Sequence, residues 1–146
     1  MLQRKDVAPD FKVGEGSLYQ TLAERAVVVF FYPKAFTPGC TKEASTFRRE
    51  YEKLRESGCD VIGVSRDDQA TNDRFRESLS LPYPLVGDPD GKICEGYKVS
   101  WPLIGRSKRV TYLIGRDQRV RLAFHDEFRM DEHAAQACAL APVARD

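Results

Sequence analysis

Hydrophobic and polar positions follow two distinct patterns in the first half of the chain. Ala26 to Tyr32 form an uninterrupted apolar run rich in β-branched residues, which is typical of a central strand covered on both faces. Val61 to Ser65 predict a second buried strand. Between them, hydrophobic side chains spaced three and four residues apart predict an amphipathic helix, which ends at Gly58 as its C-cap. The spaced residues are Ala44, Phe47, Tyr51 and Leu54.

The middle of the chain alternates shorter helical and strand patterns. Asp67 or Asp68 is expected to cap a helix that runs to about Leu79. Residues 84–86 predict a short strand, and the sequence from Asp88 to Gly91 predicts a turn.

A hairpin and a last helix complete the pattern. Residues 109–114 and 119–124 predict two strands that flank a tight turn and pair antiparallel. An Ala-rich helix is predicted from Asp131 to Leu140, and Pro142 is expected to stop it. The order β-α-β-α-β-β-α predicts an α/β domain of thioredoxin-like fold, with a central mixed sheet flanked by helices.

Length and charge narrow the class of protein. At 146 residues and 16.6 kDa, we expect one domain spanning residues 1–146. A formal net charge of +1 gives no overall basic field, so neither nucleic acid nor a membrane is expected as a partner. The longest apolar run is too short to span a bilayer, and the polar N-terminal residues do not resemble a signal peptide. We therefore expect a cytoplasmic location.

The chain has four cysteines, and their spacing bears on their chemistry. None of them forms a C-x-x-C pair, so a structural zinc site is not expected, and free thiols are the default in the cytoplasm. The turn at Asp88 lacks a glutamate at position 12 of a calcium loop, and no nucleotide-binding motif is present. We predict neither a metal nor a cofactor. The cysteines are Cys40, Cys59, Cys94 and Cys138.

Among the four cysteines, Cys40 occupies the position that most favours a reactive thiol. It follows the apolar strand and a Pro/Gly-rich turn, and it begins the amphipathic helix. Unpaired N–H groups and the helix dipole favour a thiolate at that place. From this residue alone, a reactive thiol and a buried structural cysteine are about equally well supported.

Several motifs around Cys40 resemble those of one enzyme family. Pro33, Thr37 and Cys40 match the pattern P-x-x-x-[TS]-x-x-C, within a longer string that runs from Phe31 to Ala44. With these residues the chain resembles a peroxiredoxin of the bacterioferritin comigratory protein (peroxiredoxin Q) branch, over roughly residues 4–125. Further matching segments are Ala8–Phe11, as the family's N-terminal extension, Gly63–Asp67, Asp88–Gly91 and Arg109–Ile114.

This resemblance implies a thiol-dependent peroxidase acting on hydrogen peroxide and organic hydroperoxides in antioxidant defence. Cys40 would attack the peroxide and become a sulfenic acid. Arg109 would lower the pKa of the thiol and hold the peroxide oxygens, and Thr37 would direct its hydroxyl at the same place. Without the family pattern, Thr37 fits the role of a simple N-cap, and Arg109 is better explained as one of several solvated basic residues.

Three neighbours receive supporting roles from the same resemblance. Pro33 would shape and shield the pocket. The backbone N–H of Cys40, joined by that of Gly39, would add a donor at the helix start. Glu43 would orient the arginine or support the loop. Exposed Phe36 offers an apolar contact for alkyl or lipid peroxides. The two histidines, His125 and His133, are predicted to lie on the surface.

The chain departs from the family at the step that recycles the cysteine. Many relatives carry a resolving cysteine five residues after the reactive one, where this chain has Ser45. Either an external thiol (thioredoxin, glutaredoxin or a low-molecular-weight thiol) reduces the sulfenic acid, or Cys94 or Cys138 resolves it, with Cys59 the weaker candidate. We expect a monomer or a weak homodimer.

Two other functions fit the same fold. A thiol–disulfide oxidoreductase would need a second cysteine where Thr37 stands, so the sequence argues against it. A redox sensor would use the same sulfenic acid of Cys40 as a signal, and turnover with a thiol would distinguish an enzyme from a sensor.

Overall fold

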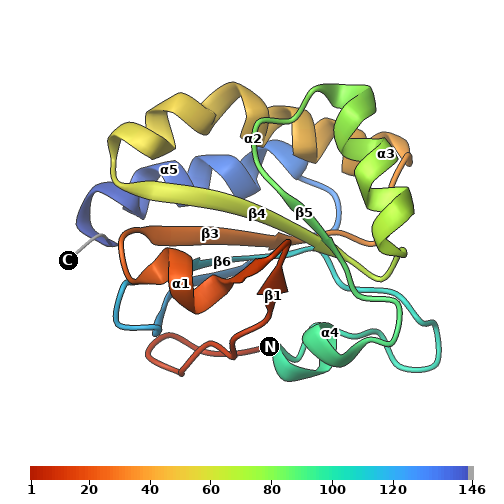
Figure 1. Ribbon diagram of the computed structural model, residues 1–146, viewed down its shortest axis with the longest axis horizontal. Helices are drawn as coiled ribbons and strands as arrows, with labels where there is room; N and C mark the ends of the chain where they lie inside the picture. The colour runs from red at the N-terminus through yellow and green to blue at the C-terminus, as the bar shows by residue number, and fades with distance from the viewer. Residues whose placement is uncertain (145–146) are drawn as a thin grey trace.

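A five-stranded mixed sheet forms the centre of the fold, in a computed structural model that describes residues 1–144 (Figure 1). The two last positions of the predicted 1–146 domain lie outside the described residues. The strand order is β5-β4-β3-β6-β7, with β3 parallel to β4 and antiparallel to β6. The strands are β3 (Ala26–Phe31), β4 (Cys59–Ser65), β5 (Leu85–Gly87), β6 (Val110–Ile114) and β7 (Val120–His125). The predicted thioredoxin-like α/β fold is confirmed.

Helices cover both faces of this sheet. One face carries the three longest helices, α2 (Pro38–Glu56), α3 (Gln69–Leu79) and α5 (Met130–Ala144) (Figure 1). The opposite face carries α1 (Leu18–Leu22), α4 (Lys92–Gly96) and the small hairpin of β1 (Lys12–Val13) and β2 (Gly16–Ser17). Side chains of β3 alternate between the two cores, with Val28 and Phe30 on one side and Val29 and Phe31 on the other. This explains why the strand reads as an uninterrupted apolar run.

Aromatic packing fixes α2 on the sheet. The rings of Phe30 and Phe47 stack with centroids 4.5 Å apart, and the Tyr83 hydroxyl donates to the Ala44 carbonyl at 2.7 Å. Rings that pack this closely contribute about 0.5–1.5 kcal/mol beyond their buried area. The start of α2 therefore has a defined position relative to the end of β3.

The predicted helix ends are partly right. Asp68 caps α3 by accepting from the Thr71 N–H at 2.8 Å, and Gly58 takes a φ of 86° after α2. The prediction that Pro142 stops the last helix is wrong, since α5 runs to Ala144 with the proline inside it. A proline this close to the end removes a single N–H donor, so its cost is confined to the last turn.

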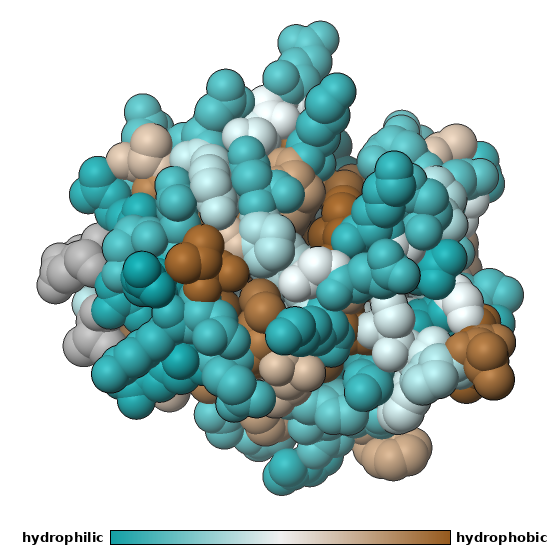
Figure 2. Space-filling view, turned by 90° about the horizontal axis from the view of Figure 1, so that it is seen from below, coloured by the Kyte–Doolittle hydropathy of each residue, from teal (hydrophilic) through white to brown (hydrophobic). Residues whose placement is uncertain are grey.

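The surface is mostly polar. Seen from the side of α1 and α4, hydrophobic side chains appear as separate small patches among hydrophilic ones (Figure 2). Among the described residues, no helix has both the length and the apolar character needed to cross a membrane.

Candidate active site

The loop after β3 delivers Cys40 to the start of α2. Phe36 in this loop has a φ of 67°, a left-handed conformation that is costly for a residue with a side chain. Two contacts hold it there: the Phe36 ring packs on Phe75 at 5.2 Å, and the Ala35 N–H donates to the Asp67 carboxylate at 2.8 Å. The strained loop is thus anchored to the segment after β4.

The first turn of α2 presents backbone donors next to the thiol. Thr37 is the N-cap residue, Pro38 has no N–H, and Gly39 and Cys40 follow in positions whose N–H groups have no carbonyl partner within the helix. The Thr37 hydroxyl donates to the Lys34 carbonyl at 2.7 Å rather than to the sulfur. Although Thr37 stands at the N-cap position, its side chain makes no hydrogen bond to the N–H groups of the first helical turn. The N–H groups and the helix dipole both favour negative charge at this point.

Arg109, the residue just before β6, reaches the sulfur of Cys40. Its Nη1 lies 3.5 Å from Cys40 Sγ and donates to Glu43 Oε1 at 2.9 Å. Its Nε donates to the Glu127 carbonyl at 3.2 Å, while its backbone N–H donates to the Glu127 carboxylate at 2.8 Å. Burial opposes the cation, but Glu43 and Cys40 outweigh burial and raise the pKa of Arg109. The guanidinium is therefore a permanent, fixed positive charge beside the thiol.

Glu43 lies one turn after Cys40 and is fully buried. Burial raises the pKa of its carboxyl to about 8, although the charge and hydrogen bond of Arg109 act in the opposite direction. Its Oε1 accepts from Arg109, so the carboxyl fixes the orientation of the guanidinium. The structure therefore places Glu43 where the sequence predicted a group that orients the arginine.

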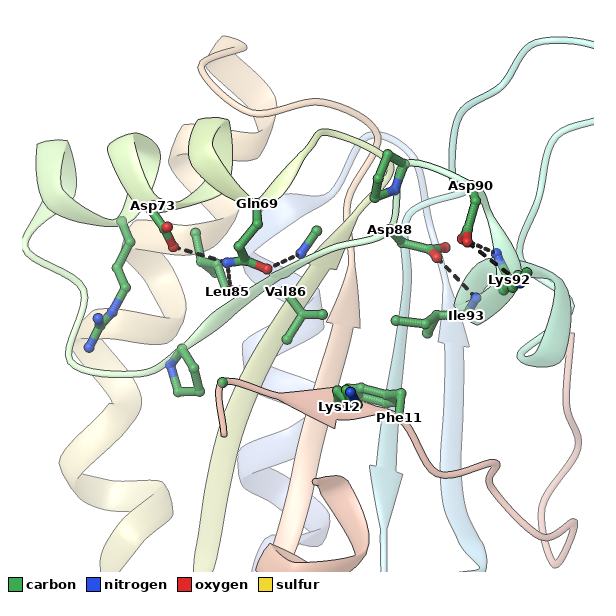
Figure 3. A pocket seen from close by; sticks show the side chains of 15 residues that line it. Phe11, Lys12, Gln69, Asp73, Leu85, Val86, Asp88, Asp90, Lys92 and Ile93 are labelled. Atoms are coloured by element: carbon green, nitrogen blue, oxygen red, sulfur yellow. Dashed lines mark hydrogen bonds and ion pairs between the residues drawn. The ribbon is translucent and has the colours of Figure 1, made fainter. Parts of the chain in front are cut away.

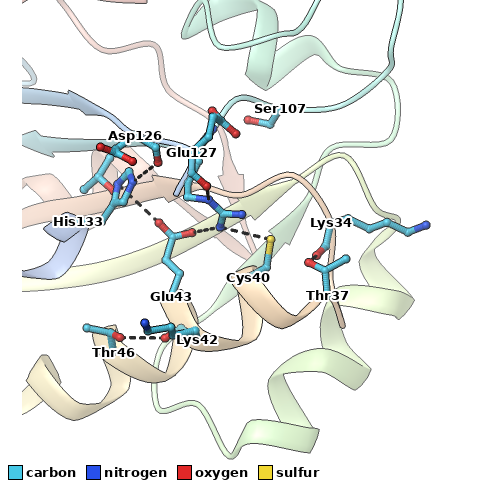
Figure 4. Close-up of polar contacts among 12 residues, drawn as sticks. Lys34, Thr37, Cys40, Lys42, Glu43, Thr46, Ser107, Asp126, Glu127 and His133 are labelled. Carbon is cyan, nitrogen blue, oxygen red and sulfur yellow. Dashed lines mark hydrogen bonds and ion pairs between the residues drawn. The ribbon is translucent and has the colours of Figure 1, made fainter. Parts of the chain in front are cut away.

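His133 belongs to the same cluster, and the prediction that it lies on the surface is wrong. Its side chain is 0% exposed, and its Nδ1 lies 2.7 Å from Thr111 Oγ1 and 3.6 Å from Glu43 Oε2 (Figure 4). The packing of α5 on α2 and β6 buries it. His133 falls on the stripe of α5 that also buries Ala137 and Ala141, a spacing of four that the sequence already contained. His125 is exposed, as predicted.

Gly39 and Pro33 lie on either side of the turn. A Cβ at Gly39 would be 2.5 Å from the Met130 methyl and 3.2 Å from Arg109 Nη2, so the close approach of the arginine to the helix needs a glycine there. Pro33 is half-buried and lines a shallow hollow of about 180 Å³ together with Lys34 and Arg106. Cys40 itself is only 1% exposed.

The structure does not bring the candidate resolving cysteines to Cys40. Cys94 lies in the core on the opposite face of the sheet, where burial and the Asp88 carboxylate raise the pKa of its thiol. Cys138 lies on α5 near Glu50, with Sγ 4.0 Å from the carboxylate. Glu50 is ten residues further along α2, roughly 15 Å by helix rise. A disulfide requires Cα atoms within about 7 Å.

Cys59 is also buried, and its thiol lies 3.9 Å from the Ala141 carbonyl, as expected for a packing residue. Within residues 1–144, no three His, Cys, Asp or Glu side chains are grouped as metal ligands. The arrangement around Cys40 instead suits a nucleophilic sulfur, since a fixed cation and backbone donors surround it.

A larger groove of about 630 Å³ lies elsewhere, between α3, β5, β1 and α4 (Figure 3). Two of its polar side chains hold the backbone of neighbouring segments. Gln69 bonds to Asp73 and to the backbone of Leu85 and Gly87, and Asp88 accepts from the first N–H groups of α4. No cysteine lines it, so it is separate from the thiol site.

Comparisons with known proteins agree on one family. The model of the AhpC/TSA family matches residues 5–123. The crystal structure of peroxidoxin BcpB from Mycobacterium tuberculosis is 34% identical and has a TM-score of 0.92, and the match covers 100% of both chains. The bacterioferritin comigratory protein of Xanthomonas campestris, solved to study its alkyl peroxide reduction activity, is 28% identical with a TM-score of 0.75. That match covers 84% of this chain and 81% of the other.

Curated relatives are longer than this chain. The chloroplastic peroxiredoxin Q of Suaeda salsa is 40% identical over 110 residues, which are 75% of this chain and 51% of the relative. The chain therefore spans about half the length of this relative.

Proposed function

Since this chain belongs to the AhpC/TSA family, as a peroxiredoxin of the Q (bacterioferritin comigratory protein) type, we propose that it is a thiol-dependent peroxidase with Cys40 as the reactive cysteine. The observation that carries this proposal is the contact between Arg109 Nη1 and Cys40 Sγ at 3.5 Å, beside the first turn of α2. A permanent cation and a helix N-terminus are the two features that most favour a reactive thiolate.

In the proposed reaction, the Cys40 thiolate attacks the terminal oxygen of the peroxide. The S–O bond forms as the O–O bond breaks, so the sulfur is oxidised to a sulfenic acid and the peroxide is reduced to an alcohol or water. The leaving oxygen departs as alkoxide or hydroxide and takes a proton from the medium. Negative charge spreads over the S–O–O line in the transition state, and Arg109 with the N–H groups of Gly39 and Cys40 would stabilise it.

The substrates we propose are hydrogen peroxide and organic hydroperoxides. The Phe36 side chain is 53% exposed on the loop that precedes Cys40, so it offers an apolar surface for the organic part of a hydroperoxide. The alkyl peroxide reduction studied in the Xanthomonas campestris relative supports the same class of substrate. Equal rates with hydrogen peroxide and with bulky hydroperoxides would remove the role given to Phe36.

For the second half of the cycle we propose direct reduction of the sulfenic acid by an external thiol, such as thioredoxin, glutaredoxin or a low-molecular-weight thiol. Ser45 stands where many relatives have the resolving cysteine. Cys94 is separated from Cys40 by the sheet, and Cys138 by the length of three helical turns. A single-cysteine cycle needs neither of them.

Turnover of peroxide with dithiothreitol, and separately with thioredoxin and with glutaredoxin, tests the proposed function. We expect the Cys40→Ser variant to lose turnover, and the Cys138→Ser variant, which alters a half-buried thiol away from the site, to keep it. Turnover by Cys40→Ser at the wild-type rate would contradict the proposal. So would a wild-type protein that consumes no peroxide with any of the three kinds of thiol.

A further inference from the structure

One carboxyl oxygen in the core of the site has no hydrogen-bond partner among the described residues. Glu43 Oε1 accepts from Arg109, but Oε2 is buried and receives no donor. His133 Nδ1, which can carry a titratable proton, lies 3.6 Å from Oε2. Both side chains are 0% exposed, so bulk solvent reaches neither group. An ionised carboxylate left in this position would carry a large desolvation cost.

The surroundings of His133 define where its protons lie. Its Nε2 lies 2.8 Å from the Asp126 carbonyl, which can only accept, so Nε2 carries a hydrogen in every state of the ring. The Nδ1 atom faces Thr111 Oγ1 and Glu43 Oε2. The Thr111 hydroxyl can donate or accept, so it serves both the neutral and the protonated ring.

If Glu43 were ionised and His133 neutral, a carboxylate oxygen would face a nitrogen lone pair inside the core. A single added proton removes this conflict, whether it resides on Oε2 or on Nδ1. We propose that Glu43 and His133 hold one titratable proton between them, on Oε2 or on Nδ1. Through this proton, His133 acts as a positioning residue for the Arg109–Cys40 pair. The pair of Glu43 and His133 then carries no net charge, so it offsets the positive charge of Arg109 less than an ionised Glu43 beside a neutral His133 would.

The charged and titratable groups around the pair also determine which of its forms is favoured. Burial raises the pKa of Glu43 and lowers the pKa of His133, and both directions favour a neutral pair over two opposite charges. Arg109 favours ionisation of Glu43, while Glu127 opposes it. The other groups that interact with one of the two residues are Asp126 before α5, Tyr32 after β3 and Tyr83 before β5. Cys40 is linked to the pair through Arg109.

The consequence for catalysis rests on the proposed peroxidase function. Loss of the shared proton to solvent at alkaline pH would add one negative charge to the contact between Arg109 and Glu43. Arg109 would then be partly neutralised, and negative charge on the attacking sulfur and the leaving oxygen would be less well stabilised. The second-order rate constant for oxidation of Cys40 is therefore expected to fall at alkaline pH while the pair loses its proton.

Nitrogen NMR of the wild-type protein tests the shared proton without any need for activity. The chain has only two histidines, so ¹⁵N-histidine labelling gives two spin systems, with exposed His125 as the internal comparison. We expect His133 shifts to stay constant from pH 5.5 to 7.5 and to change at higher pH in a step that Glu43→Gln abolishes. A His133 transition centred near the ordinary histidine value of about 6.5, or no step up to pH 10, would overturn the proposal.

The pH profile of the rate constant tests the role of His133 in positioning. The amide of His133→Asn can donate to Glu43 Oε2 and stabilise the carboxylate, so the alkaline fall in rate should begin at least one pH unit lower. Arg106→Met, at an exposed arginine near the same loop, is the control and should leave the profile in place. A uniform loss of rate with an unchanged profile would reduce His133 to a packing residue. If the wild-type protein shows no oxidation of Cys40, the proposed function fails, while the NMR titration still decides the shared proton.

Discussion

Replacing Arg109 with methionine removes the cation from the site while keeping a side chain of similar length. The guanidinium now donates from Nη1 to Cys40 Sγ at 3.5 Å and to Glu43 Oε1 at 2.9 Å, and it is only 6% exposed. The substitution therefore tests the observation on which the proposed function depends. We expect the fold to survive at neutral pH, because Glu43, whose pKa is raised to about 8, can take up a proton when its cation is lost.

The magnitude follows from the number of charged hydrogen bonds lost at the sulfur. One hydrogen bond to a charged group is worth about 1.5–3 kcal/mol. If this interaction is made mainly in the transition state, its loss slows the oxidation of Cys40 roughly 10- to 150-fold. The rate of Cys40 oxidation in Arg109→Lys should lie between those of wild type and Arg109→Met. An ammonium supplies the charge without the fork of donors that reaches both the sulfur and Glu43.

The assay is the second-order rate constant of Cys40 oxidation by hydrogen peroxide, measured by rapid quenching with an alkylating reagent followed by mass spectrometry. Arg106→Met is the matched control, because Arg106 is an exposed arginine near the same loop. Thermal unfolding of each variant establishes that the fold is retained. A rate for folded Arg109→Met within threefold of wild type would show that Arg109 does not stabilise the reacting sulfur.

Three further predictions address the neighbouring residues. Gly39→Ala should slow Cys40 oxidation roughly three- to tenfold, because the new Cβ displaces Arg109 by a few tenths of an ångström; an unchanged rate would contradict this. The free energy of unfolding should fall from about pH 6.5 towards pH 8, by at most about 1.4 kcal/mol per pH unit, because the folded Glu43–His133 pair holds a proton that the unfolded chain has released. Urea unfolding at pH 6 and pH 8 should show this fall in wild type and not in Glu43→Gln. Cys94→Ala and Cys138→Ser should retain wild-type turnover with an external thiol, and a large loss in either would point to an internal resolving cysteine.

The fold was largely predictable because its elements have strong local patterns. The apolar run of β3 and the spacing of three and four along α2 each reflect burial against the sheet, so sequence periodicity alone locates them. The path of α5 beyond Pro142 was not predictable in this way. A single proline near a helix end costs little once the helix is packed, and packing is a tertiary effect.

The site was predictable only where a motif marked it. Cys40 and Arg109 are 69 residues apart, and only the family pattern connects them. His133 lies on an Ala-rich helix with no matching motif, and a lone histidine in such a helix does not predict a buried polar contact. Its place on the stripe with Ala137 and Ala141 was visible in the sequence, but its contact with Glu43 depends on how α5 packs on α2. The Thr37 hydroxyl also binds a backbone carbonyl that the motif does not specify.

The most direct test of the proposed peroxidase cycle is the intact mass of the reduced protein after one equivalent of hydrogen peroxide, with and without a dimedone trap. We expect a single trapped adduct on Cys40, with the other three cysteines still free. A loss of two hydrogens, with Cys40 bonded to Cys94 or Cys138, would contradict the single-cysteine cycle. An unmodified Cys40 in both samples would contradict the peroxidase itself.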